Sequence, residues 1–265
     1  MADDSAWGTG VDGCPAGWVA VTLGPAGPRT PARPRTPARP RTPAGPRTPA
    51  RPPTSARPGS PAGAVRVTVT VAPALDALPL AAVTGIDMPL GLLASGWRDA
   101  DLLARRALGR RGSTVFAIPP RPALEAPTYA EANRTCRELT GQGLSVQAYG
   151  LRRKIAEAGQ HRRLVQAAGS ALRLYEVHPE LSFAALAGAP VAESKHTPAG
   201  RAARRDLLRQ AGITLPARAA GAAEHDLLDA AAVAWTARRI AAGQAVILTN
   251  PAQQADDGTE IAVRY

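Results

Sequence analysis

TGVDGCPAGWVAVTL, residues 9–23, contains a single charged side chain, Asp12. Apolar runs lie on both sides of the turn residues Pro15 and Gly17, a pattern typical of two strands joined by a tight turn. We therefore expect a β-hairpin in which Asp12 lies where the first strand ends. A carboxylate in an apolar strand is costly unless it has a partner, so Asp12 is a candidate functional group.

The same order of glycine, aliphatic residue and aspartate recurs in AAVTGIDMPLGL, residues 81–92, where Asp87 follows a short apolar run. Before it, AVRVTVTVA, residues 64–72, alternates between apolar and polar side chains and predicts a third strand. SALRLYEVHPEL, residues 170–181, predicts a later strand that ends at Glu176. Three predicted strands thus end at or near an acidic residue.

Helical patterns occupy much of the remaining chain. Residues 97–168 are polar and mostly helical in pattern, whereas residues 197–212 and 224–243 form two further helices and residues 259–265 a closing strand. The order of elements predicts an α/β fold of the RNase H-like class. We expect one domain, residues 1–265, with a mixed five-stranded sheet: antiparallel in its first three strands, parallel in the later ones. Helices cover both faces, and residues 97–168 form a helical elaboration over one edge.

A low-complexity insertion interrupts this pattern at residues 25–64. It contains six hexads of the type PRTPAR, with eight arginines and no acidic residue. Such a composition has no bulky apolar side chain to bury and predicts a disordered surface loop. Subtracting its eight arginines from the net charge of +11 leaves +3. The folded remainder is therefore only mildly basic, although the tract itself could bind polyanions by counterion release.

The overall composition predicts a cytoplasmic protein. Two cysteines, Cys14 and Cys136, do not make a disulfide framework. The chain opens without the charged and apolar regions of a secretory signal, and it has no apolar run of eighteen residues. We therefore expect a reduced compartment and no membrane partner.

The strand ends and the last helix predict a metal centre. Neighbouring parallel strands lie about 4.8 Å apart, so Asp12 and Asp87 would face a common point. Asp226 and Asp229 share one face of the last helix because they are three residues apart, and Glu176 is a further candidate.

Carboxylates this close repel one another unless a cation neutralises them, and oxygen ligands suit Mg²⁺ or Mn²⁺. We expect all five acids to act as catalytic metal ligands in two-metal phosphodiester hydrolysis.

Each acid also has a purely structural explanation. Asp12 before Gly13 could be a turn residue, and Asp87 could cap a helix. The aspartates of the last helix could only favour its dipole. Glu176 could pair with an arginine instead of a metal.

Basic residues near residue 200 are candidates for substrate binding. These four residues could contact phosphates from a loop and a helix N-terminus: Lys195, Arg201, Arg204 and Arg205. A solvated helix face is the alternative. Three histidines lack the spacing of zinc ligands: His178, His196 and His225. Cys14 is interpreted as a packing residue.

Seven stretches resemble the predicted RNase H-like nucleases of domain-of-unknown-function family 429. They are GVDGCPAGWV, GIDMPLGL, ALGRRGSTVFAIPPRPAL, TGQGLSVQAYGLRRKIAE, YEVHPELSF, SKHTPAGRAARRDLL and HDLLDAAAVAWTARR. The resemblance covers nearly the whole chain except the hexad tract and the termini. It implies an RNase H-like sheet that carries the five acids named above. Two departures are the hexad insertion and Ala158-Gly159, where the family pattern implies a Val-Asp pair.

Two functions follow as hypotheses. The first is a Mg²⁺- or Mn²⁺-dependent nuclease or phosphodiesterase that acts on DNA or RNA. The second is a noncatalytic nucleic-acid-binding or scaffolding protein with the same fold; the low aromatic content, 4%, argues against single-strand binding by base stacking. A nucleotide-dependent kinase is disfavoured because no P-loop glycine pattern is present. The sequence predicts neither the strandedness of the substrate nor the oligomeric state.

Overall fold

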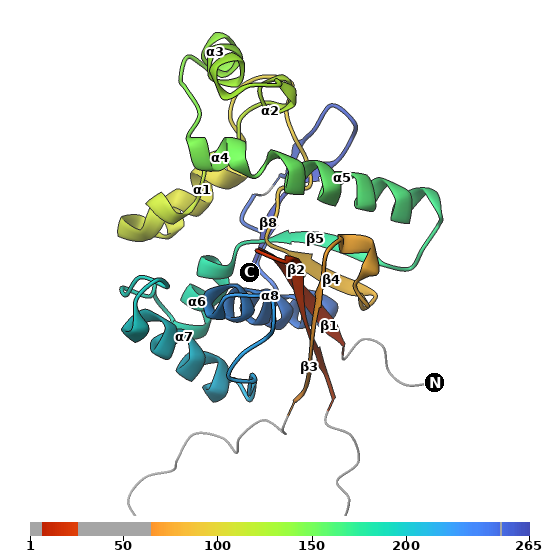
Figure 1. Cartoon of the computed structure of the whole chain (residues 1–265), viewed down its shortest axis with the longest axis vertical. Helices are drawn as coiled ribbons and strands as arrows, with labels where there is room; N and C mark the ends of the chain where they lie inside the picture. Colours follow the sequence, from red (N-terminus) through yellow and green to blue (C-terminus); the bar gives the residue numbers. More distant parts are fainter. Residues whose placement is uncertain (1–6, 26–64, 250) are drawn as a thin grey trace, which may run out of the picture.

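A central sheet organises the computed structural model, which describes residues 7–25, 65–249 and 251–265. Its six strands lie in the order β3-β2-β1-β4-β5-β8 (Figure 1). β1 pairs antiparallel with β2, and β2 with β3, whereas β4, β5 and β8 follow in parallel. The strands are β1 (Gly8–Cys14), β2 (Gly17–Gly24), β3 (Arg66–Ala72), β4 (Val83–Ile86), β5 (Arg173–Val177) and β8 (Val263–Arg264).

The predicted mixed α/β sheet with RNase H-like strand order is confirmed. The count differs by one strand, because the chain end adds β8 beside β5. Residues 259–265 do not form one strand: β7 (Glu260–Ile261) pairs with β6 (Gln253–Gln254) in a separate hairpin before β8 begins. The expected insertion at residues 25–64 lies, apart from residue 25, outside the described residues.

Helices cover both faces of the sheet (Figure 1). On one face lie α6 (Pro179–Ala187), α7 (Pro198–Gln210) and α8 (Glu224–Ala241), and on the other lies α5 (Arg152–Ala167). Alternate residues of β2 divide between the two cores, since Val19 and Val21 pack with α8 whereas Trp18 packs with Ile155 of α5. This is the period of two expected of a sheet buried on both sides.

The elaboration expected at residues 97–168 is present except for α5, which covers a face of the sheet and not its edge. It contains α1 (Asp99–Ala107), a 3-10 turn (Gly109–Thr114), α2 (Arg121–Glu125), α3 (Tyr129–Thr140) and α4 (Val146–Gly150). A second 3-10 turn, Leu75–Ala77, lies in the connection before β4. α1 packs against the edge strand β8 through a cluster that includes Ala104 and Val263. α2 to α4 have a small core of their own around Cys136 and Tyr149. Across the described ranges no helix has the length and apolarity needed to cross a membrane.

Glycines let α8 lie directly on the sheet. A Cβ at Gly10 of β1 would stand 2.1 Å from the Ala230 carbonyl oxygen and 2.1 Å from the Ala234 nitrogen, both on α8. At Gly8 the nearest atom would be the Arg238 nitrogen, at 2.7 Å. Any larger side chain at Gly10 would therefore push the helix off the strand. This contact determines which turn of α8 meets the end of β1.

Candidate metal centre

The register of β1 and β4 brings two acids to the same face of the sheet. Gly10 is the partner of Gly85, and Val11 is the partner of Ile86. Asp12 follows Val11, and Asp87 follows Ile86. The Asp87 N–H donates to the Val11 carbonyl at 2.9 Å. Because residues two apart share a face, both carboxylates lie on the side of Gly10 and Gly85. That side is the one covered by α8.

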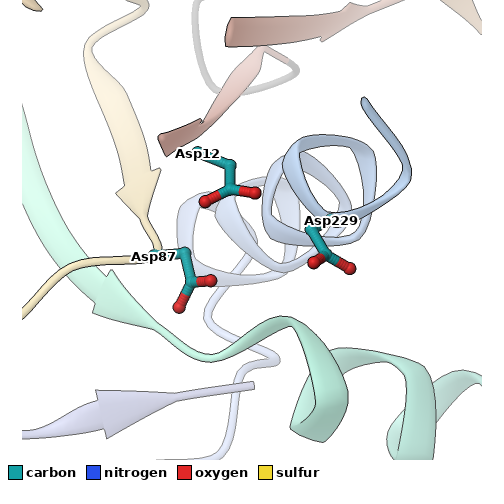
Figure 2. A group of neighbouring side chains, drawn as sticks. All are labelled: Asp12, Asp87 and Asp229. Atoms are coloured by element: carbon teal, nitrogen blue, oxygen red, sulfur yellow. The ribbon is translucent and has the colours of Figure 1, made fainter. Parts of the chain in front are cut away.

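The third acid comes from α8 itself. Asp229 directly precedes Ala230, whose carbonyl lies against Gly10, so this turn of the helix lies beside the ends of β1 and β4. Figure 2 shows the three carboxylates around one space, each from a different element. One oxygen of each of Asp12, Asp87 and Asp229 lies within 4.8 Å of the others. The predicted convergence is therefore present for three of the five acids.

Burial makes this cluster electrostatically costly. Asp12 is 8% exposed and Asp229 is fully buried. Burial, with the charges of Asp87 and Asp229, raises the pKa of Asp12 well above its usual value. Burial also raises the pKa of Asp87 to about 8, although the nearby Lys195 acts in the opposite direction. The negative charges of these carboxylates are therefore only partly balanced by protein groups, and a bound cation would stabilise the charged forms.

Lys195 is the basic residue that reaches this cluster. Its ammonium lies 2.5 Å from Asp229 Oδ2. Burial lowers the pKa of Lys195, but Asp229 and Asp12 outweigh burial and raise it above its usual value. Asp229 Oδ1, in contrast, has no hydrogen-bond partner among the described residues although it is buried. A buried carboxylate oxygen without a partner, in a residue clustered with two further acids, fits a metal ligand.

A cleft of about 600 Å³ opens beside the cluster, and Asp12 and Asp87 line it. Its volume lies in the range typical of small-molecule sites, about 300–1,000 Å³. The side chains around its wall include cations, an exposed aromatic ring and a histidine: Arg111, Thr114, Phe116, Lys154, His178 and Lys195. Burial and the Lys195 charge lower the pKa of His178 to about 4. The imidazole is therefore neutral near pH 7.

Glu176 does not join the cluster. It is the partner of Ile86 rather than of Asp87, so its side chain leaves β5 on the other face of the sheet, although it still lines the same cleft. There it forms a buried ion pair with Arg98 and accepts the Leu90 N–H at 3.1 Å. The structure thus shows the arginine partner that the sequence offered as an alternative for Glu176. Glu176 is absent from the group of three because a one-residue offset reverses the face of a strand residue.

Asp226 lies at the rim of the cleft, one turn before Asp229. Its Oδ2 accepts the Ala223 N–H at 3.1 Å, which caps the first turn of α8. Its Oδ1 lies 3.2 Å from His225 Nε2. Asp226 therefore caps the helix, a role that the sequence did not predict for it, and it lies outside the group of three.

Three of the four predicted phosphate-binding residues have other partners. Arg204 is fully buried and donates to both Glu180 carboxylate oxygens at 2.8 Å, so it cannot reach a substrate. Arg201 and Arg205 both pair with Glu224 at 2.9 Å, on the outer side of α7. Only Lys195 of this set lines the cleft.

Sequence reasoning missed a buried charge network in the wall of the cleft, which Asp101 and Glu176 line. Arg98 lies 3.6 Å from Asp101 and also pairs with Glu176. Burial raises the pKa of Asp101 to about 6, against the effect of Arg98, while Asp101 Oδ2 accepts the Ile118 N–H at 2.8 Å. Arg98 and Asp101 are three residues apart, a spacing typical of ion pairs on an exposed helix surface. The sequence therefore does not predict that this pair is buried.

The three clustered acids fit a hard divalent cation. All the donors are carboxylate oxygens, the chemistry that Mg²⁺ and Mn²⁺ prefer, and the Asp229 Oδ1 atom is free to bind. No nitrogen or sulfur ligand lies in the group, which disfavours zinc.

Comparison with known proteins finds a match to one family model. No curated protein and no solved structure matches it. The match to a family model runs from β1 to β6 and therefore includes all three clustered acids. The model is that of the family described as Protein of unknown function (DUF429), it matches residues 10–254, and the chain belongs to this family.

Proposed function

We propose that the protein is a divalent-metal-dependent nuclease or phosphodiesterase that hydrolyses phosphodiester bonds in DNA or RNA. The observation that carries the proposal is the meeting of Asp12, Asp87 and Asp229 within 4.8 Å, from three separate elements. A turn residue, a cap and a helix-dipole residue have no reason to converge. Their convergence under a cleft supports a shared cation.

In this proposal Asp12, Asp87 and Asp229 would hold Mg²⁺ or Mn²⁺. Such an ion, when bound, polarises a phosphoryl oxygen and lowers the pKa of a bound water. The carboxylates orient that ion at the floor of the cleft. Lys195 pairs with Asp229 and also lines the cleft, so its ammonium is a candidate contact for a substrate phosphate.

Other cleft residues would bind the substrate. Arg111 and Lys154 line the cleft. They are therefore better candidates for phosphate contact than the arginines of α7, which already pair with glutamates. Phe116 is 39% exposed and lines the same cleft, so its ring is available for stacking with a base. His178 contributes a neutral imidazole that can exchange hydrogen bonds without adding charge. A cytoplasmic location belongs to the proposal and is supported by the free, buried thiols of Cys14 and Cys136.

The test is cleavage of a substrate panel by the purified protein with Mn²⁺. The panel contains single-stranded, duplex, hybrid and branched nucleic acids, with EDTA as the metal-free control. We expect cleavage of at least one substrate. Asp12→Asn should lower the rate at least about 100-fold, because it removes a charged ligand from the cluster.

The noncatalytic alternative gives a different result. A binding or scaffolding protein would retain nucleic acid without cleaving it, and Asp12→Asn would leave its affinity unchanged. Absence of cleavage across the panel, with Mn²⁺ or Mg²⁺, would contradict the proposed nuclease function.

A further inference from the structure

The charges around the proposed metal centre do not match the requirements of two divalent ions. Two of the five acids once expected as ligands are engaged elsewhere, Glu176 with Arg98 and Asp226 with the start of α8. Three carboxylates remain in the cluster. Lys195 adds one positive charge at Asp229. The net charge of these four side chains is then −2, which a single divalent ion balances.

Lys195 is the cation within the described residues that pairs with a member of the cluster. The other cleft lysine, Lys154, lies over the Trp18 ring at 4.3 Å and donates to the Gly17 carbonyl. The two lysines therefore share a cleft but have different partners. Of the two, only the Lys195 ammonium lies against a clustered carboxylate, at Asp229 Oδ2.

The loop that carries Lys195 is anchored on both sides. The Thr197 N–H and hydroxyl donate to the Ser194 carbonyl at 3.0 and 2.8 Å. A Cβ at Gly200 would stand 1.9 Å from that same carbonyl oxygen, so α7 begins in direct contact with the loop. Arg204 donates to the Glu193 carbonyl at 2.9 Å.

This anchoring gives the buried Arg204 a role. Its guanidinium is held by Glu180 and in turn holds the backbone two residues before Lys195. The position of the ammonium is thus determined by the packing of α6 and α7, and does not depend on a flexible side chain alone.

We propose that the Lys195 ammonium takes the place of the second divalent cation, so that the centre binds one metal ion per chain. The inference rests on the proposed metal centre and replaces the two-ion mechanism expected from the sequence. Lys195 is a positioning residue for the Asp229 carboxylate, and its charge completes the neutralisation of the cluster.

Metal stoichiometry tests the inference directly. Mn²⁺ binding would be counted by calorimetry, and independently by electron paramagnetic resonance of free Mn²⁺, for the full chain and three variants. We expect one ion in the wild type. Lys195→Met should raise the count toward two, because it frees Asp229 Oδ2 and leaves the carboxylates under-neutralised. Lys195→Arg should restore a count of one, since it keeps the charge.

Lys154→Met is the matched control. It removes a lysine from the same cleft without touching a clustered carboxylate, so its count should stay at one. Two ions in the wild type, or a count that stays at one in Lys195→Met, would overturn the inference while leaving the nuclease proposal intact. A count of one that rises in Lys195→Met, in a protein that cleaves nothing, would support the inference and contradict the nuclease proposal. No Mn²⁺ binding in the wild type would contradict both.

Discussion

At the scale of single residues, the face of the sheet on which an acid lies decides its role. Asp12 and Asp87 each follow a glycine by two positions, and those glycines are partners across β1 and β4. Their pairing was predictable from the repeated glycine-aliphatic-aspartate pattern. The role of Glu176 was not, because the sequence does not reveal the register of β5 against β4. A shift of one residue would have placed Glu176 among the ligands.

Glu176→Gln should therefore affect stability and leave metal binding in place. It removes one charged partner of buried Arg98, with Asp101 still 3.6 Å away, and we expect a loss on the order of 3 kcal/mol in the free energy of unfolding. The Mn²⁺ count should not change. Urea denaturation and calorimetry provide the two measurements.

The control is the same substitution at Glu224, which pairs with two arginines but is exposed. Its cost should stay below about 1 kcal/mol, as for other surface pairs. Loss of Mn²⁺ binding in a folded Glu176→Gln protein would show that Glu176 is a ligand after all.

At the scale of elements, the site depends on how closely α8 approaches β1. The helices expected at residues 197–212 and 224–243 are present as α7 and α8, and the Thr197 hydroxyl caps α7. The partners of the α7 arginines were not predictable, since Glu180 and Glu224 belong to other helices. Contacts between elements depend on tertiary packing, which spacing within one helix does not encode.

Gly10→Ala should separate α8 from the sheet. Its Cβ would collide with backbone atoms of Ala230 and Ala234 at 2.1 Å, and backbone cannot rotate away as a side chain can. We expect a loss of about 3 kcal/mol or more in the free energy of unfolding, together with weaker Mn²⁺ binding, because Asp229 moves with the helix.

Gly159→Ala in α5 provides the comparison. Its Cβ would meet only the end of Arg163, at 3.5 Å, and alanine favours helix by about 1 kcal/mol over glycine. It should be neutral or stabilising and should leave Mn²⁺ binding intact. Equal stability of the two variants would contradict the close packing of α8 on β1.

At the scale of the whole molecule, the topology assembles acids that are more than two hundred residues apart in the chain. The crossover from β1 to β4 and the return of α8 onto the sheet were inferred from element order, and the structure confirms them. The length of the elaboration and the presence of β8 affect the walls of the cleft more than its floor. The net charge of +11 says little about this site, because eight of the arginines lie in residues 28–63.

Stability of the metal-free protein should fall as the pH rises. Asp87 has a pKa of about 8 in the fold against an ordinary value of 3.8, and the pKa of Asp12 is also raised. The folded state therefore binds these protons more tightly than the unfolded state. Their contribution to stability is fully present below about pH 4 and is lost as the pH rises through about 8.

Urea unfolding in EDTA across this range measures the slope. Asp87→Asn should reduce it, and saturating Mn²⁺ should offset the loss at high pH, because the ion replaces the protons. Metal-free stability that increases between about pH 5 and 8, or a slope unchanged by Asp87→Asn, would contradict the electrostatic account of the cluster.

The most direct test of the central claim is the anomalous diffraction of Mn²⁺ in crystals of the protein grown or soaked with that ion. We predict a peak in the space shared by the carboxylates of Asp12, Asp87 and Asp229, and its loss in Asp12→Asn. A metal-saturated crystal with no peak there, and with the three carboxylates turned to protein or water partners, would contradict the claim.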